Sequence, residues 1–511
     1  MTAGQYPDAP TRRFITFSVM AATIMNALDS TIANVALPHI QGSVSASQEE
    51  ITWVLTSYIV SAAIFTPLTG WLAGRFGRKR LMLVSVVGFT IASGLCGLAT
   101  SLPELVLFRI LQGVFGAALV PMSQAILLDI NPPERHGPAM AIWGMGAVLG
   151  PIVGPALGGW LTDNLDWRWV FYINLPIGIV TFLGISAFLS ETRDKIPPKL
   201  DFLGFALLSL GIGSLQLMLD RGQQQDWYNS LEIWIETIAM ATFFYLFIVH
   251  LLTTSKKPFI ELRLFADRNF VLGTSFGFFL GVMLFSVLAL LPPMLEGLLG
   301  YPVVLTGLVT APRGVGSLVS MVIVGQLIKR FDVRVLILIG LSFSALAMYI
   351  MSSFSLGMDS TLVMASGFIQ GLGTGLIFIP LSTLAFTTLD TRLRNEGAAM
   401  FTLIRNMGSA IGISVLQAMT IRNTSTVHAR LVENIRPDNP VLQRAMPDFD
   451  FGIPVQVARL NAEITRQAAM VSYIDTYWLL FVITCAIVPL LLLMRPAKNK
   501  PTEEDLGLHI E

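Results

Sequence analysis

The sequence predicts an all-α integral membrane protein with 14 transmembrane helices. Only 13% of its 511 residues are charged and 53% are hydrophobic, whereas soluble domains carry about 25% charged residues. Apolar segments long enough to cross a bilayer recur along the whole chain. The formal net charge is zero, so nothing indicates a nucleic-acid partner.

The segments of spanning length follow one another with short connections and a single long one. They lie near 14–36, 52–73, 81–100, 104–127, 138–161, 168–190, 202–220, 232–252, 270–292, 303–327, 334–354, 361–383, 396–419 and 473–494. No small-residue cleavage site such as Ala-x-Ala follows the first segment, so we expect it to remain as a span.

Basic residues in short loops predict the orientation, because cytoplasmic loops of membrane proteins are enriched in lysine and arginine. With the N-terminus in the cytoplasm, the inner segments hold most of the 33 lysine and arginine residues. The short outer segments then hold only Arg168 and Arg221. We therefore expect both termini to be cytoplasmic.

The two halves of the chain resemble each other. Residues 70–76 (Gly-Trp-Leu-Ala-Gly-Arg-Phe) recur as 325–331 (Gly-Gln-Leu-Ile-Lys-Arg-Phe), and the Gln-Gly pair at 112–113 recurs at 370–371. The offset corresponds to eight spans, which six spans, two extra spans and six more would produce. We expect these units at 1–190, 191–269 and 270–495, with a periplasmic loop at 420–472 and a cytoplasmic tail at 496–511.

A glycine-rich stretch within the fifth span carries a glycine at every fourth residue. On a helix this spacing forms one face without side chains, so a neighbouring helix can approach almost to backbone contact. Two prolines each remove a helical hydrogen bond and predict kinks. The pattern fits a tightly packed span, or a conformational hinge between moving helices. The residues are Gly146, Gly150, Pro151, Gly154, Pro155, Gly158 and Gly159.

Asp29 is the first candidate for proton coupling, because a carboxylate within a membrane span is costly and usually functional. Arg109 on the fourth span is its expected partner. Asp29 lies about 22 Å from the inner end of its span and Arg109 about 8 Å from the outer end of its own. In a core of about 30 Å the two side chains have similar depths. A purely structural pair, with Asp29 neutralised by a fixed partner, is the alternative.

Further polar or flexible side chains within the spans are candidates for a substrate cavity. Arg313 and Arg405 either contact substrate or bond backbone carbonyl groups as structural arginines. An excess of cationic groups around one carboxylate favours acidic or anionic amphiphiles. The cavity candidates are Met25, Asn26, Asn34, Gln112, Arg313 and Arg405.

Five motifs together resemble the 14-span drug/proton antiporter family of the major facilitator superfamily, and most of all its EmrB-like exporters. They are 28–38 (Leu-Asp-Ser-Thr-Ile-Ala-Asn-Val-Ala-Leu-Pro) in the first span, 70–80 after the second, 109–113 (Arg-Ile-Leu-Gln-Gly) in the fourth, 150–159 in the fifth and 167–178 at the sixth. The resemblance implies the major facilitator fold with a 6+2+6 arrangement of spans. It also implies a cytoplasmic gating loop that contains Gly70, Arg75, Gly77 and Arg78. Facilitators commonly carry an aspartate where this chain has Gly74, so Arg75 needs another partner.

The resemblance further implies proton-coupled efflux of hydrophobic or weakly acidic toxic compounds across the cell inner membrane. The proton gradient supplies the energy, and no cofactor or metal is expected. The loop at 420–472 contains two stretches with helical apolar spacing. It is either a loosely ordered insertion or a helical docking surface. EmrB-like proteins pair with EmrA-like periplasmic adaptors and a TolC-like outer-membrane channel, so we expect the docking surface.

Two other functions remain open at this point. A facilitator that exports a lipid or one dedicated metabolite would share every motif, and only its substrate breadth would distinguish it. A membrane-embedded enzyme would need a nucleophile with its base, or a set of metal ligands, within the spans. The sequence provides neither, so an enzyme is not expected.

Overall fold

The computed structural model describes residues 6–46, 50–132, 135–192, 200–254, 258–328, 330–390, 393–433, 435–436, 438–447 and 449–494. The first half contains α1 (Ala9–Val44), α2 (Trp53–Phe65), α3 (Leu68–Phe76), α4 (Arg78–Leu98), α5 (Leu102–Gly116), α6 (Leu119–Ile130), α7 (His136–Asn164), α8 (Trp169–Tyr172) and α9 (Asn174–Phe188). The middle contains α10 (Phe202–Arg221), the 3-10 helix η2 (Trp227–Asn229) and α11 (Leu231–Thr253). The second half contains α12 (Arg263–Ala266), α13 (Arg268–Gly297), α14 (Val303–Leu327), α15 (Val333–Met351), α16 (Ser360–Thr387), α17 (Arg394–Val432), α18 (Pro440–Ala445), α19 (Pro454–Ile487) and η4 (Val488–Leu493).

Every segment of spanning length forms a helix, and the described residues contain no strand. Within the described part, 12 helices are long and apolar enough to cross a membrane, and the pair α2–α3 makes 13 if counted as one span. That pair bends by 57° around Pro67, which lacks the N–H group that an unbroken helix needs. Helix α7 has 29 residues, enough to cross a core of about 30 Å. The total of 14 stays a prediction that fits this arrangement.

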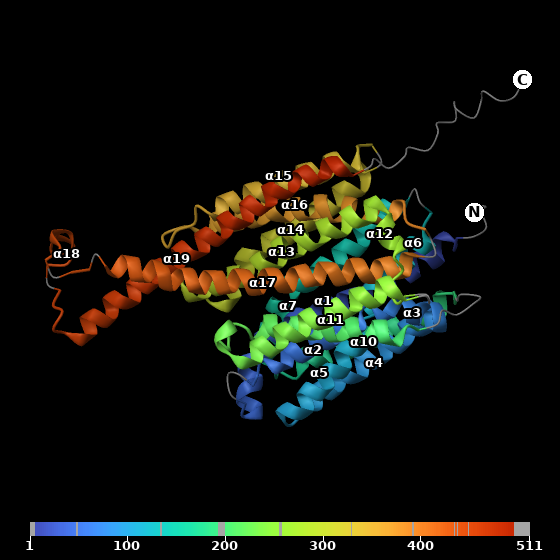
Figure 1. Cartoon of the computed structure of the whole chain (residues 1–511), viewed down its shortest axis with the longest axis horizontal. Coiled ribbons are helices and arrows are strands. Elements are labelled where there is room, and N and C mark those ends of the chain that lie inside the picture. Colours follow the sequence, from blue (N-terminus) through green and yellow to red (C-terminus); the bar gives the residue numbers. More distant parts are fainter. Residues whose placement is uncertain are drawn as a thin grey trace, which may run out of the picture.

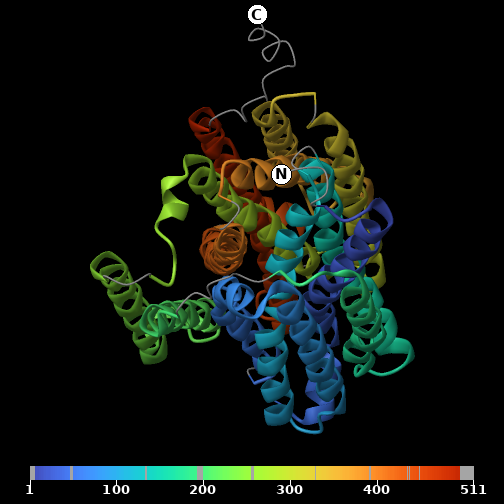
Figure 2. The same cartoon turned by 90° about the vertical axis from the view of Figure 1, so that its right-hand side faces the viewer.

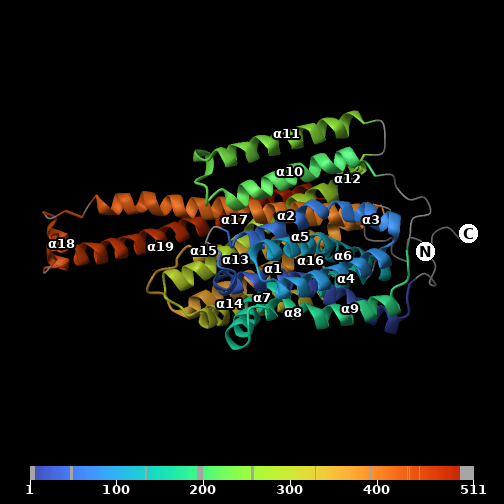
Figure 3. The same cartoon turned by 90° about the horizontal axis from the view of Figure 1, so that it is seen from below.

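The spanning helices form a bundle of two halves with an extra pair beside it (Figures 1 and 2). Helix α1 packs on α7 and α9, α2 on α5, α13 on α17, and α16 on both α14 and α15. The halves meet where α7 contacts α14 and α16, and where α17 contacts α3 and α6. Helix α10 packs on α2, whereas α11 packs mainly on α10 and lies outermost (Figure 3). The two extra spans therefore sit outside the repeated unit.

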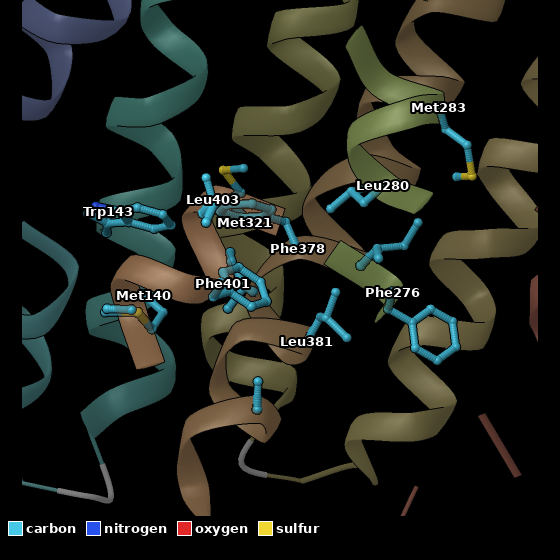
Figure 4. Packing of buried hydrophobic residues seen from close by; sticks show 14 of the residues in the cluster. Met140, Trp143, Phe276, Leu280, Met283, Met321, Phe378, Leu381, Phe401 and Leu403 are labelled. Carbon is cyan, nitrogen blue, oxygen red and sulfur yellow. The ribbon is translucent and has the colours of Figure 1, made fainter. Parts of the chain in front are cut away.

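Aromatic and methionine side chains fill the contact between the halves (Figure 4). Trp143 of α7 stacks on Phe378 of α16 with ring centroids 5.4 Å apart and planes 11° from parallel. Both rings are buried, as are Met321 and Phe401 beside them. Offset stacking of two large rings stabilises such a contact beyond its apolar area. In this conformation the halves are therefore joined by a packed apolar core.

The glycine face of α7 lies against α1. A Cβ atom at Gly150 would lie 2.6 Å from the backbone nitrogen of Leu28, and one at Gly158 would lie 3.0 Å from the carbonyl oxygen of Ile32. The Thr31 hydroxyl donates a hydrogen bond of 3.2 Å to the carbonyl oxygen of Gly150. The close approach predicted for this face is confirmed, and its partner is the helix that carries Asp29. Helix α7 is continuous through both prolines of the stretch, and its role as a hinge stays a prediction.

Helices α17 and α19 continue beyond the bundle as a helical hairpin with α18 at its tip (Figure 1). Asn423 donates a hydrogen bond of 2.7 Å to Asp475, and His428 forms one of 3.0 Å with Asn461, so the two helices are tied together along their length. The two apolar stretches predicted as helical are confirmed as helices. They are direct extensions of membrane spans.

Candidate functional site

Asp29 and Arg109 form an ion pair inside the first half of the bundle. Nη1 of Arg109 lies 2.7 Å from Oδ2 of Asp29. Asp29 is 0% exposed and Arg109 is 1% exposed. The pairing expected from the depths of the two residues in their spans is therefore present. Helix α1 positions the carboxylate and α5 the guanidinium group.

Two amide side chains complete the shell of the carboxylate. Gln112, one helical turn after Arg109, donates a hydrogen bond of 2.7 Å to Oδ1 of Asp29. Asn174, the first residue of α9, donates one of 3.0 Å to the same oxygen. All three donors are buried. The shell therefore joins α1, α5 and α9, which makes the carboxylate a junction of three helices.

Besides Asp29, Arg109 contacts a backbone carbonyl oxygen, an amide side chain and an aromatic ring. Its Nε donates 2.9 Å to the carbonyl oxygen of Val54, and its Nη1 also donates 2.8 Å to Oε1 of Gln112. Its Cζ lies 4.3 Å from the ring centroid of Tyr58, a cation–π distance. Because removal of one partner from a buried ion pair leaves an uncompensated charge, each side chain of this pair depends on the other for its counter-charge.

A second layer of hydrogen bonds supports this shell. The Asn174 side chain also donates 3.0 Å to the Ser93 hydroxyl, which donates 2.8 Å to the carbonyl oxygen of Phe171. The buried Oδ1 of Asn174 has no hydrogen-bond partner among the described residues. Asn26 donates 3.0 Å to the Tyr58 hydroxyl. Sequence reasoning did not select Tyr58, Ser93 or Asn174, although Asn174 lies within the sixth-span motif.

The structure brings together only two of the six predicted cavity residues. Gln112 lies in the carboxylate shell, and Asn26 reaches across to Tyr58 beside it. Met25 is fully buried and Asn34 is exposed on α1. None of the six lines the groove at the start of α1 and α7 that is described below. Their role as substrate contacts therefore stays a prediction.

The two intramembrane arginines of the second half differ in their contacts. Nη2 of Arg313 donates 3.0 Å to the carbonyl oxygen of Leu284, as a structural arginine does. The guanidinium group of Arg405 lies 5.6 Å from the ring centroid of Phe378. The buried Nε of Arg405 has no hydrogen-bond partner among the described residues. Of the two, Arg405 has the greater capacity to bind a further group.

The predicted gating loop lies at the end of the bundle at which α1 begins. Asp129, at the end of α6, pairs with Arg78 of α4 and lies 3.6 Å from Arg394 at the start of α17. A carboxylate of the first half thus contacts both halves. Gly74 has no carboxylate to offer, and Asp129 supplies one from α6. We call the contact of Asp129 with Arg78 and Arg394 the latch. Arg75 itself is exposed.

The loop glycines are required by close contacts. A Cβ at Gly70 would lie 3.1 Å from Cα of Glu396 on α17, so this glycine permits contact between the halves. Gly77 has φ +93°, a value that side chains rarely allow. Glu191 lies against Gly77 and accepts hydrogen bonds of 3.1 and 3.2 Å from the N–H groups of Lys79 and Arg80. A carboxylate therefore caps the start of α4.

The sequence of this chain matches a known protein family and several named proteins. A family model described as Major Facilitator Superfamily matches residues 19–413. The multidrug export protein EmrB of Escherichia coli (strain K12) is 37% identical over 471 residues, which cover 91% of this chain and 92% of that protein. The fatty acid resistance protein FarB of Neisseria gonorrhoeae is 35% identical over 496 residues, which cover 94% of this chain and 96% of FarB.

Solved structures share the fold at low sequence identity. The proton:xylose symporter XylE superposes with a TM-score of 0.59 at 15% identity, covering 94% of this chain and 97% of XylE. The human organic anion transporter MFSD10 gives a TM-score of 0.58 at 14% identity, covering 93% of this chain and 99% of MFSD10. The family match, the relatives and the fold agree: this chain belongs to the major facilitator superfamily, in which it is an EmrB-like member.

Proposed function

We propose that this protein exports hydrophobic and amphiphilic toxic compounds from the cytoplasm or the inner leaflet in exchange for protons. The observation that carries the proposal is the buried Asp29–Arg109 pair with its shell of amide donors. Relatives named for multidrug export and for fatty acid resistance support this assignment. The proton gradient supplies the energy, without a cofactor.

In the proposed exchange, Asp29 is the proton-binding group and Arg109 is its internal counter-ion. Separation of the pair opens the carboxylate to a proton, and the freed guanidinium group changes its contacts with α2. Because α1, α5 and α9 meet at Asp29, the change in charge shifts all three helices. Loss of the proton on the other side of the membrane restores the pair.

The proposed location is the cell inner membrane, with both termini in the cytoplasm. The distribution of basic residues supports this orientation. Arg12 and Arg13 of α1, Arg78 of α4 and Arg394 of α17 gather at the end of the bundle where the latch lies. The α17–α19 hairpin extends from the opposite end (Figure 1) and would then lie in the periplasm.

Asp29→Asn tests the coupling. The amide keeps the size of the side chain and an acceptor for Arg109, but it cannot bind and release a proton. In proteoliposomes, export driven by a pH difference should fall to background, while substrate binding measured at equilibrium remains. If this variant still moves substrate against its gradient with only a pH difference as the energy source, a residue other than Asp29 carries the proton. A panel of chemically unrelated toxic compounds then separates multidrug export from export of one metabolite.

We further propose that the α17–α19 hairpin docks a periplasmic adaptor of the EmrA type, which leads to a TolC-like outer-membrane channel. Apolar side chains remain exposed around its tip, including Leu431, Phe451, Ile453 and Val455. An exposed cluster of this kind is typical of a protein contact surface. The substrates would then leave the cell without re-entering from the periplasm.

Replacement of residues 425–468 by a short flexible linker tests the docking. The Asp29 shell and the glycine face lie outside this segment, and closing the gap with a flexible linker has a small entropic cost. We expect proton-driven export in liposomes to persist, while cells lose resistance and the adaptor no longer co-purifies. Val455→Ser with Phe451→Ser should weaken adaptor binding in the intact hairpin. Resistance and adaptor binding that both survive the replacement would refute the docking.

A further inference from the structure

A groove separate from the Asp29 shell lies where α1 and α7 begin. Its volume is about 620 Å³, and the two helices line it together with Asn131 and Arg135 of the α6–α7 connection and Leu318 of α14. Sites for small molecules typically have about 300–1,000 Å³. Phe17 and Ile142 in its walls are 64% and 40% exposed. The groove is therefore large enough for a ligand and opens at the side of the bundle.

One end of the groove is basic and the remainder is apolar. Arg12, Arg13 and Arg135 line the end at which both helices begin, and no acidic side chain is among the described residues that line it. None of these three guanidinium groups forms an ion pair with a residue that the structure describes. Guanidinium groups bind carboxylates and phosphates with paired hydrogen bonds. The basic end therefore matches an anionic head group.

The apolar walls form a slot between two helices. On α1 the lining residues after Arg13 continue through Phe17 to Ile24, a distance of about 16 Å along the helix axis. The groove ends at Gly146 and Leu149, where the glycine face of α7 closes on α1. The length and volume of this slot suit an extended alkyl chain.

We propose that this groove binds an anion with a single alkyl chain before export, with its head group at the three arginines and its chain directed toward Ile24. The inference rests on the export function proposed above and names its substrate class and entry site. Such a molecule enters sideways from the membrane leaflet at the latch end of the bundle. Passage beyond Gly146 requires α1 to separate from α7. The helix displaced in that step is the one that carries Asp29.

Equilibrium binding of labelled laurate to the full-length protein in phosphatidylcholine nanodiscs tests the head-group contacts. Dodecanol, which has the same chain without the charge, is the matched ligand. For the double variant Arg12→Gln with Arg135→Gln, the dissociation constant of laurate should rise about tenfold, while that of dodecanol stays unchanged. Arg263→Gln, an exposed arginine outside the groove, should leave both unchanged. Equal loss of both ligands, or of neither, would overturn the assignment.

A second variant tests the apolar wall of the slot independently, because the double arginine substitution could impair folding. Ile142→Asp introduces a carboxylate at an exposed position of the apolar wall, and it should weaken laurate binding about tenfold or more. Displacement of laurate by phosphatidylglycerol in the nanodisc would show a site for membrane lipid and refute the single-chain ligand. If laurate binds through the arginines but no compound is exported on a pH difference, the proposed function fails and the groove stands. If export depends on Asp29 but no groove variant changes the dissociation constant of laurate, the groove assignment fails and the proposed export function stands.

Discussion

Gly150→Ala adds one methyl group to the closest contact between α1 and α7. The added carbon would lie 2.6 Å from the backbone nitrogen of Leu28 and closer still to atoms of Ala27, whereas ordinary contact begins at 3.4 Å. The backbone of α1 cannot rotate away as a side chain can. The carbonyl carbon of Ala27 would be 2.3 Å away, so the helices must separate by about 1.1 Å to restore ordinary contact. Overpacking of this kind costs about 1–3 kcal/mol. Asp29 follows Leu28 directly, and a misplacement of about 1 Å at a reacting group can cost about 100-fold in rate.

Thermal unfolding and proton-driven export of the purified protein in liposomes measure the two effects. We expect Gly150→Ala to lower the free energy of unfolding by about 1–3 kcal/mol and to slow export about tenfold or more. Gly159→Ala is the matched control on the same helix, because its Cβ would lie 3.8 Å from Val35, an ordinary contact. If both variants unfold and export like the wild type, the glycine face does not determine the spacing of the two helices.

Two further predictions concern the latch and the extra helices. Asp129→Asn removes the charge shared by two arginines and should weaken the closed latch by about 1 kcal/mol. Spin labels on α6 and α17 should then report a larger fraction of molecules with the latch open. Unchanged distances between the labels would refute the latch. Asp201 precedes α10 and accepts hydrogen bonds from two backbone N–H groups and from His250. Burial would raise the pKa of Asp201, but these donors outweigh it and hold the pKa below its ordinary value. The contribution of ionised Asp201 to the free energy of unfolding is fully present above the ordinary carboxyl pKa of about 3.9. It is lost as the pH falls through the lowered pKa of Asp201. Asp201→Ala should lower thermal stability by about 1–2 kcal/mol at neutral pH but leave export intact, and an equal loss at strongly acidic pH would contradict this account.

Features that depend on one helix alone were predictable from the sequence. Apolar length located the 12 or 13 helices of the described residues that are long and apolar enough to span, because a bilayer imposes the same length on each. The rise of 1.5 Å per residue placed Asp29 and Arg109 at similar depths, and the structure pairs them. The spacing of the glycines predicted a bare face on α7, and that face exists.

Features that depend on which helices become neighbours were not predictable in the same way. The sequence indicated that a helix approaches Gly150, but it did not identify that helix as α1. Asn174 and Tyr58 enter the site only because α9 and α2 pack beside α1 and α5. The sequence showed that Gly74 offers no carboxylate, but it did not indicate that Asp129, 55 residues further on, pairs with Arg78. Tertiary packing alone determines such contacts.

The great length of α17 has a mechanical consequence. Its 39 residues correspond to a rod about 58 Å long, which Arg394 anchors at the latch and which is tied to α19 beyond the bundle. A tilt of about 10° around the latch would carry the far end through about 10 Å. In such a tilt the hairpin of α17 and α19 would act as a lever that converts a small rearrangement of charges at the latch into a larger displacement at its tip. A partner held at the tip would sense each transport cycle as movement.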